Sequence, residues 1–81
     1  MKLKIWWNSN FGEPNFEWPV KDIDEAKYVL NLLAEYDLYL AERVDANAGG
    51  LIVLENGEWV EWYDENGDSI DEIMRSEENH P

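Results

Sequence analysis

The side chains in this sequence that could do chemistry are almost all carboxylates. The 81 residues include 19 Asp and Glu, 6 Lys and Arg, one histidine (His80) and no cysteine. Nucleophilic triads and zinc sites are built from His and Cys side chains, so neither has the residues it needs. A histidine beside the last residue of a chain is far more often solvated than catalytic. We therefore expect no catalytic residue, no metal site and no cofactor, and a function other than catalysis.

One acidic segment has a superficial likeness to a calcium-binding loop. If Asp64, Asn66 and Asp68 occupy the first, third and fifth ligand positions, Ser69 stands where the loop needs glycine. Arg75 then falls at the position of the bidentate glutamate. These two departures exclude an EF-hand. Weak calcium binding by the clustered carboxylates remains an alternative.

The negative charge is concentrated in one half of the chain. Residues 1–43 hold eight acidic and five basic residues, a net charge of −3, whereas residues 44–81 hold eleven acidic and one basic residue, a net charge of −10. Direct binding to nucleic acid or to an anionic membrane needs a basic surface, so the composition argues against both. The charge is compatible with simple solubility, with a basic protein partner, or with imitation of nucleic acid.

The spacing of the acidic residues favours a binding surface. Alternate strand residues lie about 6.6–6.8 Å apart and helix neighbours at i, i+3 or i+4 about 5–6 Å apart, comparable with successive phosphates on a nucleic-acid strand. We predict that this surface binds a basic or nucleic-acid-binding protein. The alternative is a solvated acidic face that keeps the protein monomeric. The predicted partner-binding residues are Glu55, Glu58, Trp59, Glu61, Asp64, Glu65, Asp68, Asp71 and Glu72.

These residues depend on a predicted β-hairpin over residues 51–55 and 58–63. Asn56-Gly57 is the pair that best tolerates the positive φ angles of a type I′ turn. That turn sets a register in which residue 55 faces 58, 54 faces 59, 53 faces 60, 52 faces 61 and 51 faces 62. Alternation then predicts a core face made of Leu51, Val53, Val60 and Trp62. The other face carries Ile52, Leu54, Trp59 and Glu61, ringed by Glu55 and Glu58.

The rest of the chain supplies two further strands and two helices. Alternating apolar residues predict strands over about 2–7 and 15–20, with Pro19 confining the second to an edge or a strand end. Asp22 and Glu25 predict the start of a helix over about 23–36. The segment from Asp45 to Gly50, which ends in paired glycines, is expected to stop whatever precedes it. A short helix over about 70–78 would be capped by Ser69 or Asp68. We expect a single α+β domain over residues 1–81: a two-layer sandwich with an antiparallel four-stranded sheet, one main helix on one face and a short C-terminal helix, in the order ββαββα.

The face of the sheet away from the main helix offers a second hypothesis. If the helix covers only one face, an exposed patch of Trp6, Ile52, Leu54 and Trp59 could form a homodimer. If the first strand pairs with the fourth, Lys4 and Glu61 become cross-strand partners on this face.

Several segments together resemble a known group of phage proteins. The opening Met-Lys-Leu-Lys-Ile-Trp-Trp, the acid-started helix, Asn47-Ala-Gly-Gly50 and the run from Glu58 to Glu65 are similar to small acidic accessory proteins of tailed bacteriophages. Some of these are superinfection-exclusion proteins. This resemblance implies a phage protein that acts in the bacterial cytoplasm on a host or competing-phage component, as a superinfection-exclusion factor. In size and charge the chain is also similar to phage DNA-mimic inhibitors, such as gyrase inhibitors and antirestriction proteins. That second resemblance implies an inhibitor of a DNA-binding host protein, for example gyrase. The start of the chain lacks the apolar segment of a signal peptide and no apolar run is long enough to anchor it in a membrane, so we expect a cytoplasmic protein.

Overall fold

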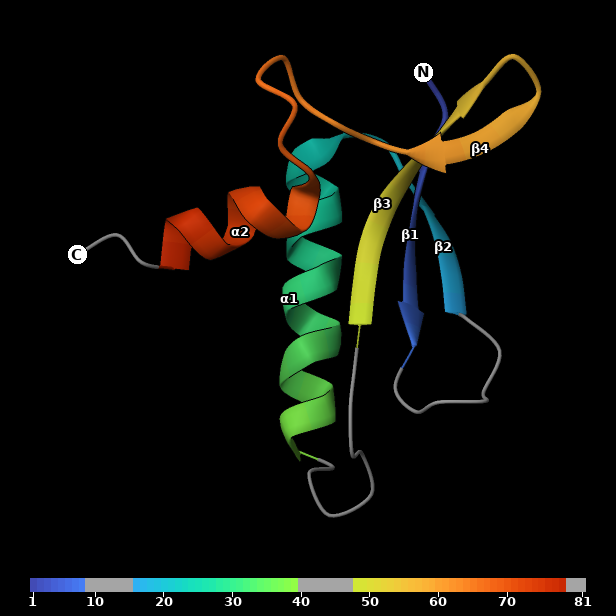
Figure 1. Cartoon of the computed structure of the whole chain (residues 1–81). Helices are drawn as coiled ribbons and strands as arrows, with labels where there is room; N and C mark the ends of the chain where they lie inside the picture. The colour runs from blue at the N-terminus through green and yellow to red at the C-terminus, as the bar shows by residue number, and fades with distance from the viewer. Residues whose placement is uncertain (9–15, 40–47, 79–81) are drawn as a thin grey trace.

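The computed structural model describes residues 1–8, 16–39 and 48–78, which form four strands and two helices (Figure 1). Expected boundaries at residue 15 and the terminal His80 lie outside these residues. The order ββαββα and the antiparallel sheet confirm the predicted α+β fold. The elements are β1 (Leu3–Asn8), β2 (Phe16–Val20), α1 (Ile23–Tyr39), β3 (Ala48–Glu55), β4 (Glu58–Glu61) and α2 (Ile70–Glu78).

The strand order is β2-β1-β3-β4, with every neighbouring pair antiparallel. The first strand therefore pairs with the third, and the expected pairing of Lys4 with Glu61 is wrong because Ile52 of β3 lies between them. Burial accounts for this order. The strands β1 and β3 hold most of the buried apolar residues of the sheet and occupy its centre, whereas all four residues of β4 are exposed.

The hairpin between β3 and β4 has the predicted turn and register. Asn56 and Gly57 adopt φ angles of 52° and 82°, as a type I′ turn requires. The four pairs from residues 52–55 to residues 61–58 are those expected from the sequence. The ladder continues beyond β4, because the amide of Trp62 donates to the carbonyl of Leu51 at 3.0 Å.

Gly49 and Gly50 lie inside β3, which therefore begins at Ala48, three residues before the expected start at residue 51. The reason is close packing and not unusual backbone angles. A Cβ on Gly49 would lie 2.6 Å from Cζ3 of Trp7, and a Cβ on Gly50 would lie 2.6 Å from Nε1 of Trp6. Each indole thus lies flat over a glycine on the neighbouring strand, one on each face of the sheet.

Both helices begin with the predicted side-chain caps. The amide of Glu25 donates to Oδ1 of Asp22 at 2.8 Å, and the Glu25 carboxylate accepts a hydrogen bond from the amide of Lys21 at 3.1 Å. The helix α1 continues to Tyr39, three residues further than expected. At α2 the cap is Ser69, whose amide and hydroxyl both donate to the Glu72 carboxylate.

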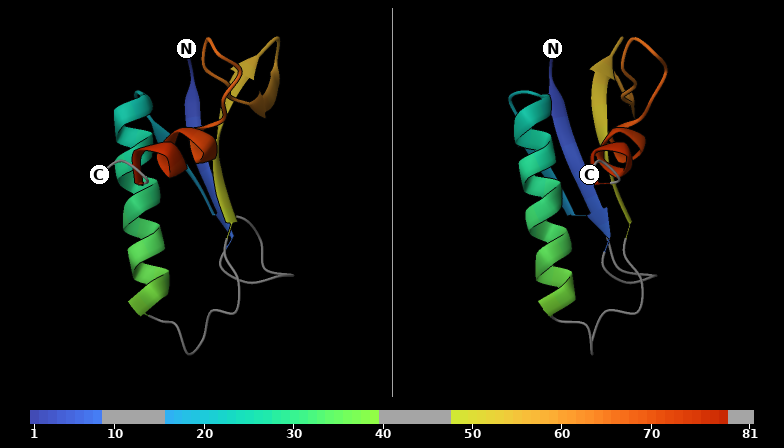
Figure 2. Two further views of the ribbon diagram at one scale, coloured as in Figure 1. Left: turned by 60° about the vertical axis from the view of Figure 1, so that its left-hand side comes forward. Right: turned by 90° about the vertical axis from the view of Figure 1, so that its left-hand side faces the viewer.

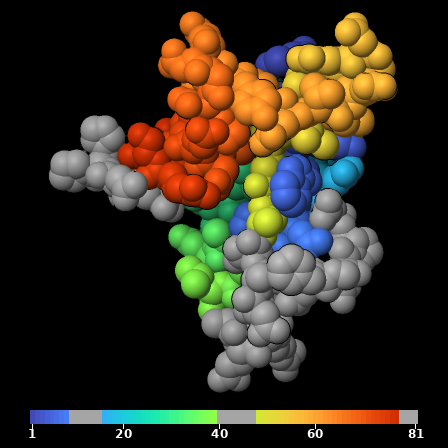
Figure 3. Space-filling view, viewed as in Figure 1, coloured from blue at the N-terminus to red at the C-terminus, as the bar shows by residue number. Residues whose placement is uncertain are grey.

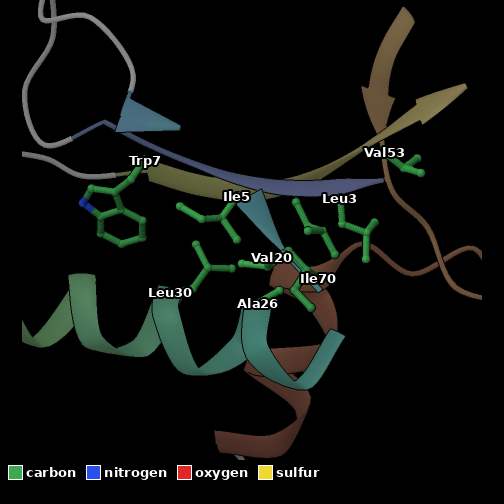
Figure 4. Close-up of a cluster of buried hydrophobic side chains, with 9 residues drawn as sticks. Leu3, Ile5, Trp7, Val20, Ala26, Leu30, Val53 and Ile70 are labelled. Atoms are coloured by element: carbon green, nitrogen blue, oxygen red, sulfur yellow. The ribbon is translucent and has the colours of Figure 1, made fainter. Parts of the chain in front are cut away.

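The two helices pack on one face of the sheet, with α1 over the β2–β1 side and α2 over β3 (Figure 2). The core between these layers is apolar (Figure 4). Val60 was expected in this core but is 37% exposed, because β4 extends past the helices at the edge of the sheet. Trp62 is half-buried against the core. The buried core residues are Leu3, Ile5, Trp7, Val20, Ala26, Leu30, Leu51, Val53 and Ile70.

Candidate functional site

The tip of the β3–β4 hairpin carries a pair of like charges. Glu55 lies directly opposite Glu58 across the turn, and both are exposed. Alternation along β4 places Glu61 on the other face of the hairpin, beside Trp59 and Ile52. The three glutamates therefore do not form one strip: two lie together at the tip, and the third belongs to the open face of the sheet.

A tight turn over residues 64–68 forms the second acidic projection. The carboxylate of Asp64 accepts hydrogen bonds from the amides of Asn66 and Asp68 at 2.8 and 2.9 Å, and Gly67 adopts a φ of 81°. Asp64 thus fixes the turn through its own side chain. Glu65 is exposed on the turn and Asp68 is half-buried. Among residues 1–8, 16–39 and 48–78, neither of these two carboxylates has a hydrogen-bond or ion-pair partner.

The two predicted site residues in α2 serve the helix itself. The Glu72 carboxylate completes the cap with Ser69, and Asp71 forms an ion pair with Arg75, with 2.6 Å between Oδ2 and Nη2. Both positions suit the positive end of the helix dipole. Among the predicted partner-binding residues, four carboxylates make none of the hydrogen bonds or ion pairs found within the described part of the chain. These are Glu55, Glu58, Glu65 and Asp68, which we call the acidic end.

The hairpin and the turn of the acidic end project beyond the same end of the sheet (Figures 1 and 3). The sequence between Ala48 and Met74 contains no Lys or Arg, so no basic residue of this segment offsets the charge of these projections. A surface of this kind attracts cationic groups over a Debye length of about 8 Å at physiological salt. It can therefore attract a basic surface electrostatically.

Glu61 has a different partner from the one expected. Its carboxylate accepts a hydrogen bond from the hydroxyl of Tyr63 at 2.9 Å. This hydrogen bond, and then the negative charge of Glu61, raise the pKa of Tyr63 above its ordinary value. Tyr63 and Glu61 thus form a local pair next to the turn, away from the hairpin tip.

The open face of the sheet is organised around Lys4, whose partners differ from the one expected from the sequence. The ammonium of Lys4 lies 2.7 Å from the Glu17 carboxylate on β2 and 4.2 Å from the centre of the Trp59 ring on β4. Lys4 therefore links both edge strands across the face. The only signal in the sequence was its outward position in β1 beside an outward tryptophan.

The predicted dimer patch is consequently interrupted by charge. Trp6, Ile52 and Leu54 are half-buried, and Trp59 is 40% exposed. Trp6 packs over Gly50, and the Lys4–Glu17 pair lies on the same face. The structure brings the four residues to one face, but it does not make them a continuous exposed apolar surface.

The helix-covered face contains a buried carboxylate. Asp37 of α1 is 3% exposed, and its Oδ2 accepts a hydrogen bond from Nε1 of Trp7 at 2.8 Å. This contact ties the last turns of α1 to the central strand. A nearby pocket of about 310 Å³ lies between α1, α2 and β3, with Leu30, Met74 and Arg75 among its lining residues.

Two further properties of the described residues bear on the site. No group of three or more His, Asp or Glu side chains within residues 1–8, 16–39 and 48–78 is arranged as a metal site. In the same part of the chain, neither helix has the length and apolar character needed to cross a bilayer.

Comparison with known proteins identifies a family. The profile of the family described as superinfection exclusion gene product 17 matches residues 2–80. No curated protein and no solved structure matches the chain. The matched segment spans both the acidic end and the open face, and its family agrees with the resemblance seen in the sequence. This protein therefore belongs to the superinfection exclusion gene product 17 family.

Proposed function

We propose that this protein acts in superinfection exclusion as a non-enzymatic binding protein, inside the bacterial host, and that its acidic end engages a basic surface on a protein partner. Membership of the superinfection exclusion gene product 17 family supports the biological role. The pairing of Glu55 with Glu58 is the observation that carries the binding mode.

Like charges directly opposite each other destabilise a strand pair, so this hairpin tip is held at a cost in stability. Two rigid turns support it: the type I′ turn at Asn56-Gly57 and the turn closed by the Asp64 carboxylate. A preorganised acidic surface loses little conformational entropy on binding, and a basic partner removes the repulsion between the two glutamates. These features support a partner-binding role over a role in solubility alone.

A DNA-binding host protein, for example gyrase, is the class of partner we favour. Such proteins carry basic grooves built for phosphates, and the carboxylates of the acidic end are anionic groups on a fixed scaffold. A second protein component of the host or of a competing phage is the alternative, since any basic surface would attract the same end.

A charge-matched pair of variants tests the role of the acidic end. Glu55→Gln/Glu58→Gln removes two charges at the tip, and Asp24→Asn/Glu35→Gln removes two exposed charges from α1. In cells expressing each variant, the tip variant should lose exclusion of a superinfecting phage while the α1 variant keeps it. Equal exclusion by both variants would refute a special role for the tip.

Capture from host lysate tests the partner. The wild-type protein should retain a basic protein whose recovery falls as salt rises, and the tip variant should retain less of it. Added duplex DNA should displace the captured protein if its DNA-binding groove is used. Capture that ignores duplex DNA would contradict the DNA-mimic hypothesis and leave the alternative of another basic surface.

A further inference from the structure

A pair of stacked aromatic rings lies exposed on the edge strand β2. The ring centroids of Phe16 and Trp18 are 6.1 Å apart and their planes differ by 14°. Both alternate in phase with buried Val20, so they point to the helix-covered side of the sheet, yet they are 46% and 53% exposed. The cover provided by α1 thus ends before it reaches these two rings.

One side of α1 contacts α2 and faces the pocket between α1, α2 and β3. Lys27 bonds Glu77 of α2 at 2.6 Å, and Asn31 and Ala34 line the pocket shared with β3 and α2. The sheet order places β2 on the other side of β1 from β3, so the opposite side of α1 faces β2. Half-buried Val29 and Leu33 lie on that side.

An exposed apolar row continues from there along α1. Tyr28, Leu32 and Tyr36 follow i, i+4, i+8 spacing and are 68%, 53% and 57% exposed. These three residues and the Phe16–Trp18 pair lie on the side of the molecule that carries the helices, and we call them together the apolar face. It is distinct from the open face of the sheet, because it lies on the side of the molecule that carries the helices.

The size of the apolar face fits a protein interface. A buried aromatic side chain covers roughly 150–250 Å², so the exposed fractions of its four aromatic residues leave about 340–560 Å² in water. A standard interface takes about 800 Å² from each partner, of which about 56–65% is apolar. The aromatic residues alone therefore supply the apolar part of one such interface.

The distribution of charge along the chain indicates what kind of partner covers the apolar face. It lies in the half of the chain with a net charge of −3, and the half with −10 holds the acidic end. A basic partner would be drawn to the acidic end, whereas a partner for the apolar face must itself present an apolar, weakly charged surface. We propose that this partner is a second copy of the chain, joined through the same face in a two-fold dimer.

The edge of β2 argues for contact through side chains instead of an extended sheet. The carbonyl of Lys2 accepts from the amide of Leu54, so the even-numbered residues of β1 direct their peptide groups to β3. Pro19 pairs with Lys4, and its nitrogen therefore points out of the sheet with no hydrogen to donate. Strand pairing at this edge is weakened, so association on this side of the molecule would use the side chains of the apolar face.

Sedimentation velocity of the full chain over micromolar concentrations at physiological salt tests the proposal. The wild-type protein should dimerise, and higher salt should strengthen the dimer because it screens repulsion between two acidic copies. Trp18→Ser/Tyr36→Ser should weaken dimerisation by about tenfold or more. Trp59→Ser, on the open face, is the matched control and should leave the dimer unchanged.

Leu32→Arg provides a second test in case the double variant misfolds, because Leu32 is an exposed helix residue outside the core. It should be monomeric with a wild-type circular dichroism spectrum. A wild-type protein that stays monomeric at every concentration overturns the proposal. So does a dimer that survives Leu32→Arg and is lost in Trp59→Ser, which would assign association to the open face.

Discussion

The two faces of the sheet hold neighbouring tryptophans in different ways. Trp7 is buried under α1, packs against Gly49 and donates its indole N–H to a buried aspartate. Trp6, one residue earlier, is half-buried over Gly50 on a face that no described helix covers. The covered face thus relies on close packing around the buried hydrogen bond between Trp7 and Asp37, whereas the open face relies on half-buried rings and one lysine.

The two glycines give the largest expected contrast between the faces. Gly49→Ala places a Cβ against the buried ring of Trp7, and overpacking of this kind should cost about 3 kcal/mol of the free energy of unfolding. Gly50→Ala should cost about 1 kcal/mol or less, because the ring of Trp6 can move toward solvent. Urea denaturation followed by circular dichroism measures both. Equal losses would show that the two faces are packed equally tightly.

Replacing each tryptophan by phenylalanine compares the stability that the two rings contribute. Trp7→Phe removes the N–H that bonds the Asp37 carboxylate, and a hydrogen bond to a charged group is worth about 1.5–3 kcal/mol. Trp6→Phe loses no hydrogen bond found among the described residues and should cost about 1 kcal/mol or less. Thermal unfolding of the two variants provides the measurement. A Trp6→Phe variant that is as unstable as Trp7→Phe would contradict the contrast.

Lys4 provides a smaller effect confined to the open face. Lys4→Met removes the contacts with Glu17 and Trp59, and the cation–π contact and the ion pair are together worth about 1 kcal/mol. Lys4→Arg keeps a cation and should restore most of that stability. A double-mutant cycle of Lys4→Met with Trp59→Leu isolates the ring contact, and a coupling energy of zero would show that the contact contributes nothing.

The smallest effect is a change in one titration. Because the raised pKa of Tyr63 favours its protonated form in the folded state, the resulting stability is present below the ordinary tyrosine pKa of about 10 and is lost as pH rises through the folded-state pKa. Glu61→Gln should lower the pKa of Tyr63 toward its ordinary value. Carbon NMR of labelled tyrosine follows this titration, and an unchanged pKa in that variant would rule out Glu61 as the cause.

Features set by near neighbours in the sequence were predictable. The Asn56-Gly57 turn, the register of the hairpin and the cap at Asp22 each depend on residues within a few positions of one another. Residue types that can be read directly from the sequence specify these features. One example is the Asn-Gly pair, which tolerates positive φ angles, between two β-rich segments. The family resemblance was also visible, because the matched segment covers nearly the whole chain.

Features set by distant contacts were not predictable from the same patterns. The pairing of β1 with β3 depends on which strands bury most surface, and the place of Gly49 depends on a tryptophan far away in the chain. The site shows the same division. The sequence shows which residues carry carboxylates. The strand register and the local hydrogen bonds are needed to tell an exposed carboxylate such as that of Glu55 from one that stabilises a turn, such as that of Asp64.

The central place of β1 has a consequence for the nascent chain. Leu3 pairs with Val20 on one side and with Val53 on the other, so one edge of β1 waits for a strand made much later. At about 5–20 residues per second, ribosomal synthesis leaves that edge without its partner for about 2–7 s. Lys4 lies within this strand and Lys2 directly precedes it, and charged residues at an unpaired strand edge disfavour pairing with other chains. We therefore expect Lys4, which contacts both edge strands once the sheet is complete, to disfavour association of β1 with other chains during translation as well.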